Sequence, residues 1–119
     1  MKTVSHWING SLSTDKAAQV GEIFNPATGK ISGTVNFADL ATVDKAVQAA
    51  SSAFDTWRHS SLTKRTQVLF AFRELVNKNK EKIAELITAE HGKVLSDAQG
   101  EVTRGLEVVE FACGIPHLL

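Results

Sequence analysis

The sequence predicts an α+β segment, in which a small N-terminal antiparallel β-hairpin is followed by about four α-helices. Short apolar runs separated by turn signals occupy residues 6–37, as is typical of hairpins. After Asp39 the apolar residues recur at three- and four-residue spacing, which indicates amphipathic helices. With 119 residues, the chain amounts to one domain at most.

Three short runs make up the predicted sheet. The predicted strands are His6–Ser11, Val20–Phe24 and Ile31–Phe37. The first ends in Asn9-Gly10, a strong signal for a tight hairpin turn. Residues 25–30 form the turn between the other two, where Gly29 can supply a positive φ. We therefore expect the first 38 residues to form a small antiparallel sheet.

Caps and breaks delimit the predicted helices. The candidate N-caps are Thr42, with Asp44 in the first turn, then Ser60 or Ser61, and finally Ser96 or Asp97. The run Lys78-Asn79-Lys80 interrupts the apolar pattern and separates the second helix from the third. Gly92 suits the position after the third helix, because helices commonly end on a left-handed glycine.

The last predicted helix is apolar over more than one face. One stripe contains Ala98, Val102, Gly105, Leu106, Val109, Ala112 and Cys113; a second contains Asp97, Glu101, Arg104, Val108 and Phe111; Thr103, Glu107 and Glu110 form a solvent-type face. Gly100 and Gly105 each cost about 1 kcal/mol relative to alanine inside a helix, so we expect another backbone to approach them closely. Residues 116–119 form an apolar chain end, which is typical of a segment of a longer protein, so we expect the chain to be such a segment.

Composition argues against several classes of function. Lys plus Arg and Asp plus Glu both number 13, so the charge balance favours neither nucleic acid nor a membrane surface as a partner. The single cysteine excludes an internal disulfide framework. Residues 1–6 lack an apolar signal region, and no run approaches the ~20 apolar residues of a membrane span. We therefore expect a cytoplasmic protein.

By local chemistry alone, the sequence contains no catalytic, cofactor-binding or metal site. Cys113 lies on the apolar stripe without a cationic neighbour in sequence, which favours a small buried side chain over a nucleophile. His91 precedes Gly92 at a helix end, where its charge can meet the helix dipole. The histidines, at positions 6, 59, 91 and 117, are too dispersed to indicate a metal site. Glycines are spaced for a hairpin and not for a phosphate-binding loop.

The chain nevertheless resembles the N-terminus of the aldehyde dehydrogenase superfamily along nearly its whole length. The matching motifs are Trp7-Ile8-Asn9-Gly10, Phe24-Asn25-Pro26-Ala27-Thr28-Gly29, the helix from Val43 to Trp57, and Leu86-Ile87-Thr88-x-Glu90-x-Gly92-Lys93. Glu90-His91-Gly92-Lys93 together with the stretch from Gly100 to Pro116 resembles one branch, the CoA-acylating methylmalonate-semialdehyde (malonate-semialdehyde) dehydrogenases.

The resemblance implies that residues 1–119 are the N-terminal part of a Rossmann-type NAD-binding domain, with the catalytic domain absent. It also implies an oxidoreductase of valine catabolism that converts methylmalonate semialdehyde, CoA and NAD to propionyl-CoA, carbon dioxide and NADH. The full-length parent protein would bind the small semialdehyde as its substrate. It would be a homodimer or a homotetramer. The family's catalytic cysteine would lie beyond position 119. We therefore expect the chain alone to be inactive and to bind neither NAD nor CoA.

Arg104 is the residue that the resemblance links to substrate. It occupies the place of the arginine in the Gly-Glu-Val-x-Arg-Gly motif, which in this branch contacts the substrate carboxylate. A guanidinium offers two parallel donors to such a group. The competing interpretation is a helix-surface ion pair of Arg104 with Glu101 or Glu107.

Two other classes of function compete with the dehydrogenase interpretation. One is a stand-alone helical module that binds a partner through its apolar last helix. The other is a structural subunit, without catalysis, that completes a separately encoded dehydrogenase.

Overall fold

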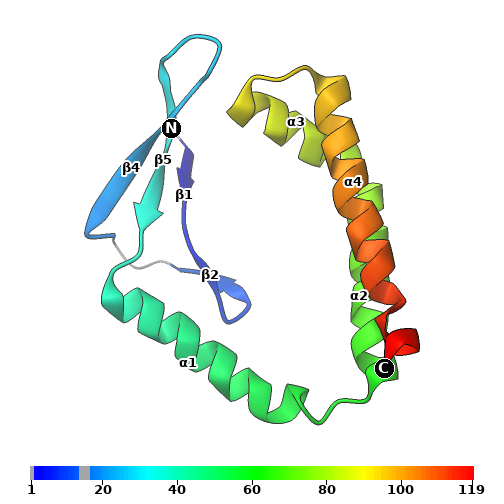
Figure 1. Cartoon of the computed structure of the whole chain (residues 1–119). Coiled ribbons are helices and arrows are strands. Elements are labelled where there is room, and N and C mark those ends of the chain that lie inside the picture. The colour runs from blue at the N-terminus through cyan, green and yellow to red at the C-terminus, as the bar shows by residue number, and fades with distance from the viewer. Residues whose placement is uncertain (1, 14–16) are drawn as a thin grey trace. The chain divides into compact units, whose positions relative to one another are not determined.

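The computed structural model describes residues 2–13 and 17–119, which divide into two compact units. Unit 1 is Met1–His59 and contains the strands and the first helix. Unit 2 is Ser60–Leu119 and contains the remaining helices. Figure 1 shows this order of elements. The predicted α+β class is confirmed, with a strand-rich N-terminal part followed by helices.

Unit 1 contains a three-stranded sheet in the order β1-β5-β4, as far as the described residues show. Strands β4 (Gln19–Phe24) and β5 (Ile31–Phe37) are antiparallel, which confirms the predicted hairpin. Strand β1 (Lys2–Val4) pairs in parallel with β5 and was not predicted. The expectation of a purely antiparallel sheet is therefore wrong. Three residues carry too little periodicity to mark a strand in a sequence.

The second predicted hairpin also forms. Strands β2 (Trp7–Ile8) and β3 (Ser11–Leu12) pair antiparallel around Asn9-Gly10. Both turn residues have positive φ, 51° at Asn9 and 77° at Gly10, as a type I′ turn requires. This turn twists in the same sense as the strands that it joins.

Helix α1 (Leu40–Trp57) begins earlier than predicted. Its N-cap is Asp39, whose Oδ1 accepts a hydrogen bond of 2.8 Å from the backbone N–H of Thr42. Thr42 therefore lies inside the helix, and Asp44 lies beyond its first turn. The prediction of Thr42 as the cap is wrong because an aspartate three residues upstream reaches the same unpaired N–H group.

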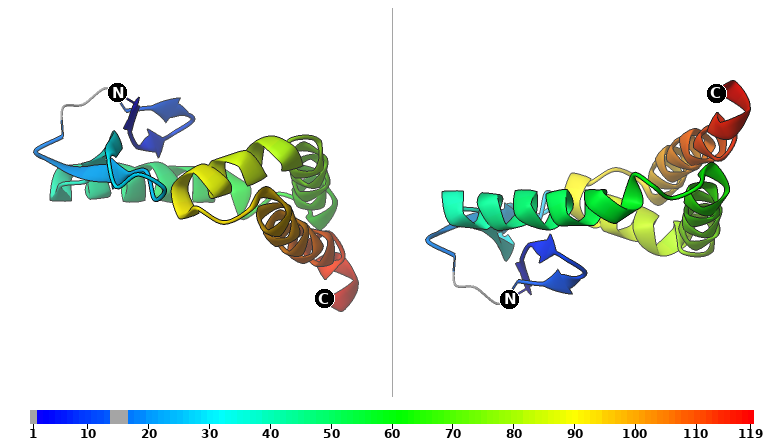
Figure 2. Two further views of the ribbon diagram at one scale, coloured as in Figure 1. Left: turned by 90° about the horizontal axis from the view of Figure 1, so that it is seen from above. Right: turned by 90° about the horizontal axis from the view of Figure 1, so that it is seen from below.

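Unit 2 consists of helices α2 (Leu62–Lys78), α3 (Lys80–His91) and α4 (Leu95–Cys113) and a terminal 3-10 turn, η1 (Ile115–Leu118). Helix α4 runs antiparallel to α2, and α3 leads away from the end of α2 (Figures 1 and 2). The helix boundaries agree with the predicted break at residues 78–80.

Two of the predicted caps in unit 2 are confirmed and one is wrong. Ser61 caps α2 by accepting from the backbone N–H of Lys64 at 3.2 Å. Gly92 ends α3 in the left-handed conformation, with φ 87°. Helix α4, however, starts after Val94, which provides no side-chain cap, so neither Ser96 nor Asp97 is its N-cap.

The packed core of unit 2 lies between α3 and α4. Ala84 and Ala98 are fully buried, and Val102 is 6% exposed; Val76, Ile83 and Ile87 pack against them. Alanines at the contact let the two helices approach closely, because no bulky side chain separates them. The buried face of α4, namely Ala98, Val102, Leu106 and Cys113, is the apolar stripe predicted from the sequence.

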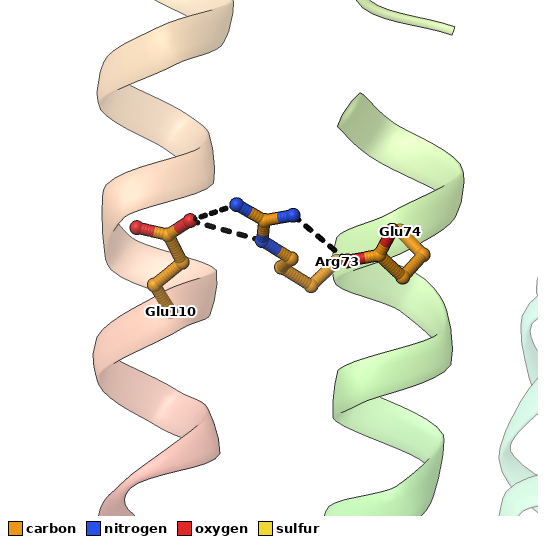
Figure 3. A network of polar contacts seen from close by, with 3 residues as sticks. All are labelled: Arg73, Glu74 and Glu110. Atoms are coloured by element: carbon orange, nitrogen blue, oxygen red, sulfur yellow. Dashed lines mark hydrogen bonds and ion pairs between the residues drawn. The ribbon is translucent and has the colours of Figure 1, made fainter. Parts of the chain in front are cut away.

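An ion-pair network ties α2 to α4 (Figure 3). The Arg73 Nε and Nη2 both donate to Oε1 of Glu110, at 2.9 and 2.6 Å, and Nη1 donates to Glu74 at 2.8 Å. The two carboxylates raise the pKa of Arg73, Glu110 more than Glu74. Glu110 was expected on a solvated face with Thr103. Glu110 is indeed exposed, and it also bridges two helices. The Thr103 hydroxyl donates to the Gln99 carbonyl oxygen at 2.9 Å.

Within the part of the chain that the structure describes, more large hydrophobic side chains are exposed than buried. The buried hydrophobic residues are Ala84, Ala98, Val102, Leu106 and Cys113. The exposed ones include Trp7, Phe24, Leu40, Val47, Phe54, Phe70, Val108, Phe111, Leu118 and Leu119. A soluble domain rarely leaves extended apolar faces open. Exposed apolar faces of this kind commonly mark surfaces that contact other protein.

Candidate functional site

Arg104 lies on the exposed side of α4. The helix is held by its buried residues, and Arg104 is about 200° around the helix axis from both Val102 and Leu106. Packing of α4 against α2 and α3 therefore directs Arg104 away from the core of unit 2. It belongs to the second predicted stripe, and its neighbours on that stripe, Val108 and Phe111, are 69% and 68% exposed. Within the described residues this stripe is exposed to solvent.

The guanidinium of Arg104 makes no hydrogen bond or ion pair with any residue that the structure describes. Glu101, its neighbour at i−3, instead accepts from Nζ of Lys93, and Glu107, at i+3, does not pair with it either. The competing interpretation, a surface ion pair of Arg104 with one of these glutamates, is therefore not what the structure contains. Arg104 keeps all of its donors available.

Cationic groups gather around Glu101 where α3 joins α4. The hydrogen bond from Lys93 is the largest cause of a lowered pKa at Glu101, and the charges of Lys93, His91 and Arg104 lower it further. An anionic ligand approaching this corner would therefore meet two full positive charges, from Lys93 and Arg104, opposed by one carboxylate. In the sequence, Lys93 was part of a motif and no role was predicted for it. Its pairing depends on the chain reversing at Gly92, which local patterns could not reveal.

Cys113 is buried, as predicted, on the inner stripe of α4. It borders a shallow hollow of about 250 Å³ with Phe70, Pro116 and His117. A second hollow is lined by Cys113, Phe70 and the Arg73–Glu110 pair. The side chain is 8% exposed, so a reagent would reach it only through motion of its neighbours. The geometry describes a packing residue.

The described part of the chain contains neither a cluster of metal ligands nor a helix suited to span a membrane. Among residues 2–13 and 17–119, no three His, Cys, Asp or Glu side chains come close enough together to hold a metal ion. None of the described helices has the length and apolarity needed to cross a bilayer. The glycines of residues 29–33 form the β4–β5 turn and part of β5.

Gly100 and Gly105 do not face a second backbone within the described chain. A Cβ atom built on either residue would have no neighbouring element within 4 Å. The close approach expected from the sequence is therefore absent inside this chain. Gly100 is half-buried and Gly105 is exposed.

Comparisons with known proteins agree on one family. The profile described as the aldehyde dehydrogenase family matches residues 13–119. The malonate-semialdehyde dehydrogenase of Pseudomonas aeruginosa is 44% identical over 119 residues, which are 100% of this chain and 24% of that protein. The chain thus spans about a quarter of the length of this curated relative.

Two solved structures show the same relationship in three dimensions. The methylmalonate-semialdehyde dehydrogenase of Oceanimonas doudoroffii is 46% identical and matches with a TM-score of 0.95, over 100% of this chain and 24% of that one. A Sinorhizobium meliloti protein, assigned as a methylmalonate-semialdehyde dehydrogenase and complexed with NAD, is 42% identical with a TM-score of 0.94. The match covers 99% of this chain and 24% of the Sinorhizobium meliloti chain.

Proposed function

Because the chain belongs to the aldehyde dehydrogenase family, we propose that it is the N-terminal segment of an NAD-dependent, CoA-acylating dehydrogenase of malonate or methylmalonate semialdehyde. In this proposal residues 1–119 form the first part of the NAD-binding domain. The full-length protein oxidises the aldehyde with NAD and transfers the acyl group to CoA, with loss of carbon dioxide. Like other family members, it assembles as a homodimer or homotetramer.

The free guanidinium of Arg104 is the observation that carries the substrate assignment. Malonate and methylmalonate semialdehydes bear a carboxylate as well as an aldehyde. Arg104 presents its donors on an exposed helix face and spends none of them on a described side chain. It can therefore bind a carboxylate through two parallel hydrogen bonds. The proposed role is binding and orientation of the substrate, with no part in bond breaking.

NAD and CoA are assigned to the full-length protein only. The chain offers no glycine-rich loop from which backbone N–H groups could hold a pyrophosphate. No residue of this segment is therefore assigned to either group. NAD as the hydride acceptor is supported by the solved relative in complex with it.

Substitution of Arg104 tests the proposal. In a full-length enzyme that carries this segment, Arg104→Leu should lower kcat/KM for malonate semialdehyde by about 10- to 100-fold, as expected for loss of a hydrogen bond to a charged group. Simple aliphatic aldehydes, which have no carboxylate, should be oxidised at nearly the same rate. Arg58→Leu is a matched control, because Arg58 is also exposed but lies 5.8 Å over the ring of Phe54. An equal loss on both substrate types would assign Arg104 to the fold alone.

We also propose that the 119-residue chain by itself does not oxidise aldehydes. Its single cysteine is buried in packing, and it lacks a phosphate-binding loop. The purified chain, mixed with NAD, CoA and malonate semialdehyde, should produce no NADH absorbance. NADH production by the native chain that persists after removal of contaminating enzymes would contradict this, and Cys113→Ala would show whether that activity depends on the cysteine.

The exposed apolar faces also fit a second candidate function, a helical module or structural subunit that binds a partner without catalysis. Phe111 and Leu118, 68% and 70% exposed, would then dock the partner. Sedimentation of the isolated chain distinguishes the two. A stable, monodisperse species favours a module, whereas aggregation favours a segment that needs the remainder of its own fold.

A further inference from the structure

The ion pair between Lys93 and Glu101 lies beside the proposed substrate residue. Lys93 stands between α3 and α4, immediately after the left-handed Gly92 that turns the chain. Its Nζ donates to Oε1 of Glu101, which lies in the second turn of α4. The side chain of Lys93 is only 20% exposed and that of Glu101 is 42% exposed. The pair is thus partly shielded from solvent, and the turn at Gly92 sets the position of the Lys93 backbone.

Glu101 has two cations within reach. Arg104 follows it by three residues, a spacing at which oppositely charged side chains on a helix attract one another. The charge of Arg104 does act on Glu101, since it contributes to the lowered pKa of that carboxyl. The hydrogen bond nevertheless goes to Lys93. A carboxylate already bound to an ammonium group attracts a second cation less strongly, so Arg104 is left unpaired.

We propose that Lys93 is a positioning residue for substrate binding: it occupies Glu101 and so keeps Arg104 free for the carboxylate of the semialdehyde. This inference rests on the proposed function of Arg104. The three side chains together carry one net positive charge, which favours an anionic ligand. Without Lys93, Glu101 and Arg104 would form a neutral pair. The substrate would then have to displace Glu101 before it could bind.

The size of the effect follows from the population of free Arg104. A ligand that binds one state of a residue has its apparent affinity reduced by the fraction of molecules in that state. Exposed and helix-surface ion pairs shift such equilibria by about two- to fivefold. Loss of Lys93 should therefore raise KM for a carboxylate-bearing semialdehyde by about two- to fivefold. The chemical step should be unaffected, because no reacting atom is touched.

The test uses full-length enzyme that carries this segment, with malonate semialdehyde and a simple aliphatic aldehyde as substrates. In Lys93→Met, KM for malonate semialdehyde should rise two- to fivefold, with kcat and the kinetics of the aliphatic aldehyde unchanged. Lys93→Arg should keep the native KM, because it can still bind Glu101. Lys82→Met, an exposed lysine of α3, is the matched control and should change nothing.

The double variant Lys93→Met/Glu101→Gln decides the mechanism. It removes both charges of the pair, so Arg104 is free again and the native KM should return. A double variant that stays impaired would mean that Lys93 binds substrate directly, and would overturn the positioning role. If Lys93→Met is poorly folded, Glu101→Gln alone serves: its KM should not exceed that of the native enzyme, and a higher KM would equally overturn the inference.

Failure of the inference and failure of the proposed function give different results. An unchanged KM in Lys93→Met, with selectivity lost in Arg104→Leu, overturns only the role of Lys93. Retention of full carboxylate selectivity in Arg104→Leu overturns the proposed substrate site, and the role of Lys93 with it.

Discussion

Replacement of Gly105 by alanine should stabilise the 119-residue chain. Gly105 is inside α4, and a Cβ atom placed on it meets no neighbouring element within 4 Å. Alanine restricts the unfolded chain more than glycine does and favours the helix by about 0.5–1 kcal/mol. Thermal unfolding followed by circular dichroism should show this gain as a rise in Tm of about 2–4 °C for a chain of this size. If folding is marginal, increased helical ellipticity reports the same effect.

Gly92→Ala is the matched control, because the same chemical change should have the opposite sign there. Gly92 has φ 87°, a conformation that costs other L-residues about 1–2 kcal/mol. A destabilised Gly105→Ala chain would refute the reasoning, since it would mean that a contact on α4 already limits that position. Loss of stability only in the full-length protein would instead locate the close backbone approach in the remainder of that protein.

Three further changes follow from the structure. Gly33→Ala should free β1 from the sheet, since its Cβ would lie 2.7 Å from the Lys2 carbonyl oxygen; amide exchange of β1 should accelerate while β4 stays protected. Cys113→Ala should cost only about 1 kcal/mol, and thiol reagents should label the native cysteine slowly at neutral pH; rapid labelling would contradict its buried position. Hydrogen bonds from the Thr42 side chain and backbone lower the pKa of Asp39, so the stabilisation by this cap should be complete above about pH 4 and disappear as the pH falls through the lowered value. The difference in helicity between the native chain and Asp39→Ala, measured from neutral to acidic pH, should therefore shrink; a constant difference would contradict this.

Elements with a repeating local signal were predictable from the sequence. Alternation identified β5 with its exact bounds, and the Asn9-Gly10 turn signal identified the β2–β3 hairpin. Helical spacing identified the buried face of α4. Each of these signals comes from residues within one strand, one hairpin or one helix, so it does not depend on the rest of the fold.

Features that depend on distant residues were missed. Strand β1 exists because β5 offers a free edge some thirty residues later in the chain. Arg73 and Glu110 are 37 residues apart and meet only because α2 and α4 pack antiparallel. The prediction of the N-cap of α4 was wrong for a different reason. Ser96 and Asp97 are residue types that cap helices well, but the helix begins before them, after Val94, whose side chain cannot cap.

On the exposed side of α4, Arg104 shares one stripe with two apolar residues, Val108 and Phe111. In bulk water, two opposite charges 4 Å apart attract by only about 1 kcal/mol, whereas near a protein surface of lower effective dielectric the attraction is about 4 kcal/mol. Arg104 alone, on an exposed helix, would therefore hold a carboxylate weakly. Val108 and Phe111 provide an apolar surface for a covering segment on the same face, and that cover would remove water from around the guanidinium. Under the proposed role of Arg104, such a cover would strengthen its interaction with a carboxylate, so we expect the carboxylate affinity to be higher in the full-length protein than in the isolated chain.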